Sequence, residues 1–257
     1  MLRDNVCYIV WTQLKFVTML DRAGCMACKT MFETEIPWLN PVLAQHIVRR
    51  FLSSGSTPKT MIDMGMGPGY LVKELAAVTN ARLIGVDCNP IMLELTQALL
   101  ATHEIPNERV TLCLDDVHHL SFPDNFADLI VSFGCVHHWH DPVLGVRQCM
   151  RVLKPSGTLF FIDALPITDA IIQHLEEQIK DQEVLWILKK AALEGLSRGR
   201  VKDIFTSAGV HDVHVGYAQF DHEDFLMCMD ILSEHQFIGK YEPSKQFFSS
   251  WEVVINK

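Results

Sequence analysis

The chain has 257 residues, 49% of them hydrophobic, and a formal net charge of −9 at pH 7. This length is enough for one α/β domain with additions and a sizeable buried core. The acidic balance and the lack of a Lys/Arg cluster argue against a nucleic-acid partner, because phosphate binding normally requires a basic patch.

The first twenty residues do not predict a targeting segment. Thr12, Gln13 and Lys15 interrupt the apolar stretch that precedes them, whereas a secretory signal needs a continuous apolar core. No run of eighteen apolar residues exists in the sequence, so we expect no membrane span. The sequence therefore predicts a cytoplasmic protein.

The segment up to about Leu52 has apolar residues at helical spacing, with a break near Pro37 and an end at residues 53–56. Within it, Cys25 and Cys28 have the two-residue separation of many zinc and redox sites. The chain offers no second pair of this kind to complete a four-thiolate site. We therefore expect an ordinary pair of thiols and no bound metal.

The next segment is an apolar run that ends on Asp63 and continues into glycines at alternate positions, Gly65, Gly67 and Gly69. Glycine permits a positive φ and lets a ligand approach the backbone closely. In a dinucleotide site the third glycine follows the second by three residues, but Tyr70 occupies that place here. A carboxylate beside the loop would repel phosphate and attract a cation. The pattern thus predicts a strand–loop–helix turn for a positively charged ligand.

Strand and helix patterns then alternate, which predicts a parallel sheet with right-handed crossovers. Strands are expected near 59–64, 82–87, 109–114, 127–132 and 157–163, and helices near 70–78, 90–102 and 142–152.

The glycine segment resembles the first motif of class I S-adenosylmethionine-dependent methyltransferases, whose cofactor carries a sulfonium and an ammonium group. Four further segments resemble that family and follow in its order, namely 83–87, 115–122, 126–132 and 151–163. The resemblance covers roughly residues 58 to 165. It implies a doubly wound, mostly parallel sheet of seven strands, with the last strand, near 247–255, antiparallel between the fifth and sixth.

The resemblance also implies where the cofactor would bind, because such sheets bind ligands beyond the carboxyl ends of their strands. Asp63 and the glycine loop would face the methionine part, and Asp87 would accept from the ribose hydroxyls. Asp116 would accept from the adenine amino group while the Val117 amide donates to the ring, with Asp115 as the alternative acid. The acids could instead only cap helices and turns. The full predicted cofactor set is Asp63, Gly65, Met66, Gly67, Gly69, Asp87, Cys88, Asp115, Asp116, Val117 and Ser132. Met66 is soft enough to lie beside a sulfonium, or it points away from the cleft.

The fourth strand leads into residues 132–140, which contain His137 and His138. This segment departs from the Asn/Asp-Pro-Pro-aromatic motif of nucleic-acid and amide methyltransferases, which favours a small-molecule acceptor. Either imidazole could take a proton from the acceptor, or it could contact the cofactor or brace the loop. Cys135 and His140 lie nearby, but consecutive histidines cannot all point inward, so we expect no metal here.

The remaining residues predict a domain of about 56–257 preceded by a helical lid at 1–55. Helical insertions at about 168–195 and 222–238 would select the acceptor, with a helix at 200–208 and a strand at 210–217 between them. The predicted function is methyl transfer from S-adenosylmethionine to an oxygen, nitrogen, sulfur or carbon atom of a small molecule, yielding S-adenosylhomocysteine. The alternatives are a non-transfer or structural use of that cofactor, a nucleotide-dependent oxidoreductase, and a metal-binding module. A homodimer is compatible with the sequence.

Overall fold

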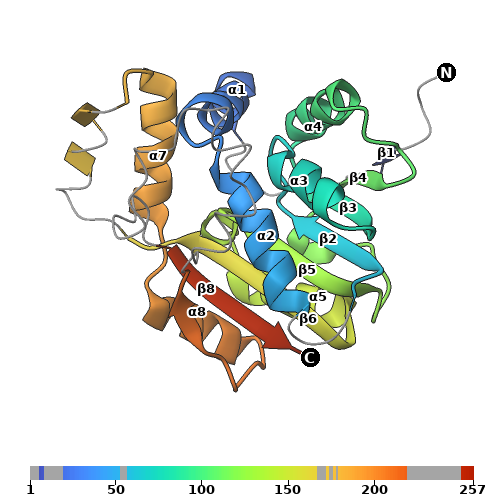
Figure 1. Ribbon diagram of the computed structural model, residues 1–257. Helices are drawn as coiled ribbons and strands as arrows, with labels where there is room; N and C mark the ends of the chain where they lie inside the picture. Colours follow the sequence, from blue (N-terminus) through green and yellow to red (C-terminus); the bar gives the residue numbers. More distant parts are fainter. Residues whose placement is uncertain are drawn as a thin grey trace.

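The protein is described by a computed structural model for residues 6–8, 20–52, 57–166, 172–173, 176–177, 179–218 and 250–257. One mixed sheet runs through the molecule in the order β1-β4-β3-β2-β5-β6-β8-β7 (Figure 1). Its strands are β1 (Val6–Tyr8), β2 (Thr60–Met64), β3 (Arg82–Asp87), β4 (Val110–Leu114), β5 (Ala127–Phe133), β6 (Leu153–Ala164), β7 (Val215–Tyr217) and β8 (Ser250–Asn256). The helices are α1 (Arg22–Thr30), α2 (Leu39–Leu52), α3 (Tyr70–Val78), α4 (Pro90–Thr102), α5 (Pro142–Val152), α7 (Gln182–Glu194) and α8 (Arg198–Ser207). Three single turns, η1 (Met31–Glu35), η2 (Val117–His119) and η3 (Val136–His138), complete the described elements.

The predicted seven-stranded sheet is confirmed, including the antiparallel β8 between β6 and β7. An eighth strand was not predicted, because β1 lies in a segment that we expected to be helical. It pairs in parallel with β4, placing Val6 opposite Leu112. The open edge of β4 supplies backbone partners that local helical spacing does not reveal.

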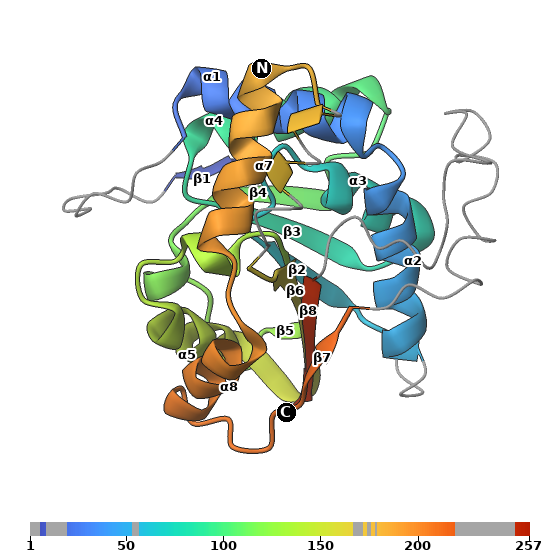
Figure 2. The same cartoon turned by 90° about the vertical axis from the view of Figure 1, so that its left-hand side faces the viewer.

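Alternating side chains along the strands enter two separate cores, as the period of two in a strand requires. In β2, Ile62 and Met64 pack on one face and Met61 on the other. The first face is covered by α5 and α8, and the second by α2, α3 and α4 (Figure 2). The result is a three-layer arrangement.

Helix starts follow from local capping chemistry. Asn89 accepts a hydrogen bond from the Ile91 amide ahead of α4, and Asp141 accepts one from Leu144 at the start of α5. Each cap is followed directly by a proline, which suits the first helical position. Asp181 caps α7 in the same way, through the amides of residues 183 and 184.

A third, smaller core joins α1 and α7, which lie side by side in both views. It contains Ala27 and Met31 from the N-terminal side and Val184 and Leu188 from α7. The predicted insertion at 168–195 therefore contains α7, whereas the one at 222–238 lies outside the described residues. The strand predicted at 210–217 is shorter in the structure, because only Val215–Tyr217 pair with β8.

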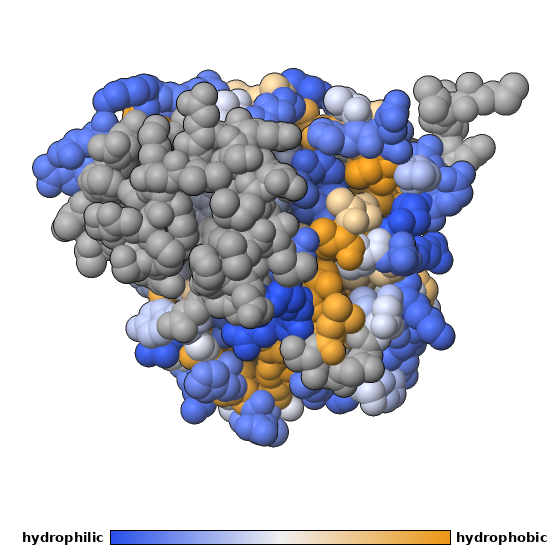
Figure 3. All heavy atoms as spheres, viewed as in Figure 1, coloured by the Kyte–Doolittle hydropathy of each residue, from blue (hydrophilic) through white to orange (hydrophobic). Residues whose placement is uncertain are grey.

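The coloured part of the face in Figure 3 is mostly hydrophilic, with a narrow strip of apolar residues near the centre of the view. Among the described residues, no helix combines the length and the hydropathy needed to cross a bilayer.

Candidate functional site

The glycine loop connects β2 to α3 and is tied to the neighbouring strand. The amides of Gly65 and Met66 both donate to the carbonyl oxygen of Val86, at 2.8 and 3.0 Å. All three glycines have a positive φ, with values of 73° at Gly65, 54° at Gly67 and 86° at Gly69. This backbone shape is the one that glycine adopts without strain, as predicted.

The three glycines differ in what surrounds them. A Cβ on Gly65 would lie 2.0 Å from the Cys135 sulfur, and one on Gly69 would lie 2.3 Å from a methyl group of Thr96. A Cβ on Gly67 would meet nothing within 4 Å. Gly67 therefore marks the open side of the loop, where a ligand could approach the backbone.

Two buried carboxyl groups lie beside this loop. Asp87 accepts hydrogen bonds from the Gly67 amide at 3.0 Å and from the Asn89 amide at 2.8 Å. Asp63 is 4% exposed, and its Oδ2 has no hydrogen-bond partner among the residues that the structure describes. Burial raises the pKa of Asp87 to about 6, while burial and the charge of Asp87 raise the pKa of Asp63 to about 8. Such a pair favours a cation in its vicinity.

The two acids predicted for the adenine side both make local hydrogen bonds. Asp115 accepts from the Asp116 amide and from the amide and hydroxyl of Ser121. Asp116 uses its Oδ1 to accept from the His118 amide at 2.9 Å and to contact the His118 ring at 2.5 Å. Burial alone would raise the pKa of Asp116, but the hydrogen bonds from His118 lower it below its usual value. Both acids thus hold the turn at η2, which begins with the buried Val117.

Two other predicted residues, Ser132 and Met66, direct their side chains into the protein interior. The Ser132 hydroxyl donates to the Met64 carbonyl at 2.9 Å and links β5 to β2. The Met66 sulfur packs over Gly85, so of the two orientations that the sequence allowed, Met66 points away from the open side of the loop. Cys88 is half-buried, and burial raises the pKa of its thiol to about 12, so the group stays protonated.

His137 is held by Asp163, a fully buried residue near the end of β6. One oxygen of Asp163 lies 2.6 Å from Nδ1 of His137, and the other accepts the His137 backbone amide at 3.0 Å. Because a carboxylate accepts, Nδ1 carries a proton, and in the neutral form of the ring Nε2 then carries the lone pair. That Nε2 is buried and has no partner within the described part of the chain.

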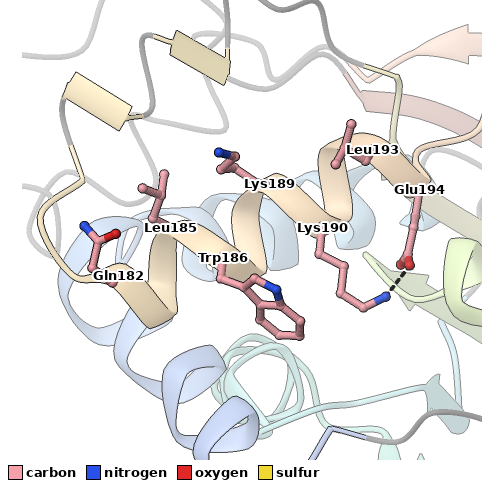
Figure 4. Close-up of a pocket in the computed structure, with 7 residues that line it drawn as sticks. All are labelled: Gln182, Leu185, Trp186, Lys189, Lys190, Leu193 and Glu194. Atoms are coloured by element: carbon pink, nitrogen blue, oxygen red, sulfur yellow. Dashed lines mark hydrogen bonds and ion pairs between the residues drawn. The ribbon is translucent and has the colours of Figure 1, made fainter.

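His138 points instead toward α7. Its Nδ1 lies 3.2 Å from Oε2 of Glu194, and its ring centroid is 3.8 Å from that of His137. Desolvation by surrounding protein atoms and the proximity of His137 lower the pKa of His138. Glu194 is also paired with Lys190, one turn earlier in the same helix (Figure 4).

The outer surface of α7 forms a shallow hollow next to the histidines. Its volume is about 470 Å³, and Glu194 belongs to its lining. Figure 4 shows Trp186, Lys190 and Glu194 projecting from one side of the helix, with Leu185 and Lys189 on the other. Trp186 is 52% exposed, which leaves an aromatic surface available in this hollow.

Cys25 and Cys28 lie in α1 as free thiols. Cys25 accepts a hydrogen bond from the Asn89 side chain at 3.3 Å, and burial raises the pKa of Cys28 to about 12. Neither cysteine belongs to a cluster of metal-ligand type among the described residues.

Sequence reasoning missed Asp163 and Glu194. Asp163 had a usable signal, because it stands near the carboxyl end of a predicted strand, where ligands bind in such sheets. Glu194 had none, because only the packing of α7 brings it to the histidine loop.

Known proteins resemble the central part of this chain. Residues 62–161 match the family model described as a methyltransferase domain. Ajmaline N-methyltransferase of Rauvolfia serpentina is 24% identical over 49% of this chain and 42% of its own length. Ubiquinone biosynthesis O-methyltransferase of Proteus mirabilis is 30% identical over 48% of each chain. The chain thus spans about half the length of these relatives.

Solved structures share the fold over most of the chain. The plantazolicin methyltransferase BpumL in complex with S-adenosylhomocysteine has a TM-score of 0.69 at 14% identity, covering 92% of this chain and 91% of its own. A methyltransferase from Aquifex aeolicus has a TM-score of 0.55 at 16% identity, with 92% and 98% covered.

Proposed function

We propose that this chain, whose residues 62–161 match the methyltransferase-domain model, is a class I S-adenosylmethionine-dependent methyltransferase and that it methylates a small-molecule acceptor. The observation that carries the proposal is the pair of buried acids beside the open glycine loop. Asp63 offers an oxygen without a partner among the described residues, and Asp87 already orders the loop through Gly67. A cationic cofactor would neutralise this pair, whereas a phosphate would not.

The cofactor supplies a methyl group on a positively charged sulfur, which is ready for in-line displacement. Asp63 would accept from its ammonium group. Asp87 would accept from the ribose hydroxyls with the lone pairs that its backbone hydrogen bonds, among them those from Gly67 and Asn89, leave free. Asp116 has its Oδ1 occupied by His118, so its contact with adenine would use Oδ2. The contribution of the protein is to hold donor and acceptor collinear in a water-poor site.

His137 and His138 would line the acceptor side, where they act on the proton that the acceptor loses. The proposal of a small acceptor is supported by relatives whose names specify ajmaline and ubiquinone biosynthesis. It is also supported by the plantazolicin methyltransferase BpumL, a structural neighbour solved with S-adenosylhomocysteine and a pentazolic desmethylPZN analogue. In this proposal residues 1–55 act as a lid, and α7 forms part of the cap over the acceptor.

Calorimetric titration with S-adenosylhomocysteine tests the cofactor assignment. We expect the wild-type protein to bind it and Asp87→Asn to bind about 10- to 100-fold more weakly, the cost of hydrogen bonds to a charged group. Asp124→Asn is the matched control, because Asp124 is an exposed acid paired with Arg151. Failure of the wild-type protein to bind this ligand would refute the assignment. Detection of S-adenosylhomocysteine formed when candidate acceptors and the cofactor are added then tests methyl transfer itself.

A further inference from the structure

The end of α7 meets the histidine loop and brings together three side chains that commonly bind metals. One potential ligand atom from each of His137, His138 and Glu194 lies within 4.8 Å of the other two. We propose that these three residues bind a divalent transition-metal ion of the zinc class. The role of the ion rests on the proposed function, whereas the arrangement of its ligands does not.

The contacts of His137 fix its ring in the orientation that a metal ligand requires. Metal-bound imidazoles almost always donate their second ring N–H to a carboxylate or carbonyl group, which fixes the tautomer and the ring orientation. Asp163 provides this contact at 2.6 Å and also holds the His137 backbone amide. The His137 side chain is 2% exposed, and its Nε2 has no partner in the described part of the chain. A buried lone pair without a partner requires a proton donor or a cation.

The distance between the proposed ligand atoms of His138 and Glu194 matches that of two atoms bound to one ion. Two atoms bound at about 2.0–2.1 Å to a tetrahedral ion lie roughly 3.3 Å apart. Nδ1 of His138 and Oε2 of Glu194 are 3.2 Å apart. Lys190 binds the other oxygen, Oε1 (Figure 4). This leaves Oε2 for the contact with His138. Ligating carboxylates usually carry a hydrogen bond of this kind.

The donor set determines the class of ion. Two imidazole nitrogens and one carboxylate oxygen suit zinc and the neighbouring divalent transition metals, whereas magnesium and calcium prefer all-oxygen sites. Three protein ligands leave a coordination position for water or for an atom of the acceptor.

Such an ion would specify the acceptor as a hydroxyl or thiol compound. His137 and His138 then act on the acceptor proton through the ion and not as free bases. Coordination lowers the pKa of the bound O–H or S–H group, which releases its proton to water. The resulting oxygen or sulfur anion forms the new bond to the methyl carbon. The carbon–sulfonium bond breaks, and its electron pair stays on the sulfur of S-adenosylhomocysteine. The charges balance without any oxidant or reductant.

Binding of Co²⁺ to the full chain tests the site independently of activity. The protein is treated with a chelator, dialysed and titrated with Co²⁺ while visible absorption is recorded, and Zn²⁺ is then added as competitor. We expect one equivalent to bind and Zn²⁺ to displace it. Glu194→Gln and His138→Gln should each weaken binding at least tenfold, and Asp163→Asn should weaken it about 10- to 100-fold through His137.

Two matched controls separate this site from general surface binding. Glu183→Gln changes another acid of α7, in its first turn, and His119→Gln changes an exposed histidine of η2. Both should bind Co²⁺ within twofold of the wild-type protein. Circular dichroism melts establish that each variant is folded. We expect Glu194→Gln to fold, because the Glu194 side chain is 39% exposed.

The outcomes distinguish this inference from the proposed function. The inference is wrong if the wild-type chain gives no saturable signal, or if Glu194→Gln binds Co²⁺ as tightly as wild type. Calorimetry with S-adenosylhomocysteine on the same samples should give equal affinity for wild type and Glu194→Gln. Cofactor binding without metal binding contradicts only the metal site, and metal binding without cofactor binding contradicts only the proposed function.

Discussion

Asp63 shows how a single carboxyl group can link cofactor binding to pH. Its ordinary pKa is about 3.9 in an unfolded chain, whereas burial and the charge of Asp87 raise it to about 8 in the folded protein. Between these two values the folded state holds more protons than the unfolded state. The contribution of Asp63 to stability is therefore fully present below about pH 4 and is lost as the pH rises through about 8.

We predict that, at pH values above 8, Asp63→Asn raises the melting temperature of the ligand-free protein. The rise should be at least about 2 °C for each kcal/mol by which the substitution increases the free energy of unfolding. The neutral amide no longer has to ionise in a buried position beside Asp87. The same variant should bind S-adenosylhomocysteine more weakly, because it offers no charge to the ammonium group. Melts recorded from pH 5 to pH 9, with calorimetry at pH 8, measure both effects.

The exposed Asp124 provides the comparison for this experiment. Asp124→Asn should reproduce the wild-type dependence of melting temperature on pH, since Asp124 forms only a surface pair with Arg151. If Asp63→Asn and wild type lose stability equally between pH 5 and pH 9, the raised pKa is not a property of Asp63.

The element that shapes the site is the strand–loop–helix unit around Gly65. We predict that Gly65→Ala lowers the free energy of unfolding by about 2–4 kcal/mol, because its φ of 73° costs about 1–2 kcal/mol for an alanine and its Cβ would overlap Cys135. Displacement of the loop should also reduce binding of S-adenosylhomocysteine. Urea unfolding and calorimetric titration measure the two effects.

Gly199→Ala is the matched control for Gly65→Ala. Gly199 lies in α8, and a Cβ there would meet no atom within 4 Å. Alanine at such a helical position should leave stability unchanged or increase it by up to about 1 kcal/mol. Equal effects of the two substitutions would show that the glycine loop tolerates a side chain.

Local patterns predicted the central elements well, and the reasons are physical. Apolar runs that end in Asp63 and Asp87 are short enough to be strands, and the alternate glycines require a sharp turn before a helix. These signals lie within a few residues of one another, so the strands and the acids at their ends followed from the local sequence, whereas the order of the strands in the sheet followed from the family resemblance.

The rest of the site depends on contacts between distant segments. The hydrogen bond from Asp163 to His137 joins β6 to η3, and the approach of Glu194 to His138 requires α7 to fold over the strand ends. Strand β1 likewise depends on the open edge of β4. The spacing of apolar residues along the chain contains no information about contacts between distant segments. The expectation that His137 and His138 bind no metal therefore took no account of Glu194.

At the scale of the whole molecule, two segments distant in sequence share a small core. Helix α1 with the turn after it contributes Ala27 and Met31, and α7 contributes Val184 and Leu188. This core is separate from the two that flank the sheet. We infer that α1 and α7 move as one unit and that any opening of the site exposes both.

Val184 tests this coupling, because its side chain is completely buried in the shared core. We predict that Val184→Ala lowers the local opening free energy of both helices by about 1–2 kcal/mol through lost burial and a residual cavity. Amide hydrogen exchange should then be roughly tenfold faster or more in α1 and α7 alike, with the strands of the sheet unchanged. Leu193→Ala, a substitution in the same helix at a side chain that is 71% exposed, should alter neither helix. Faster exchange confined to α7 would mean that α1 is held by its contacts with α4 and that the two helices cover the site independently.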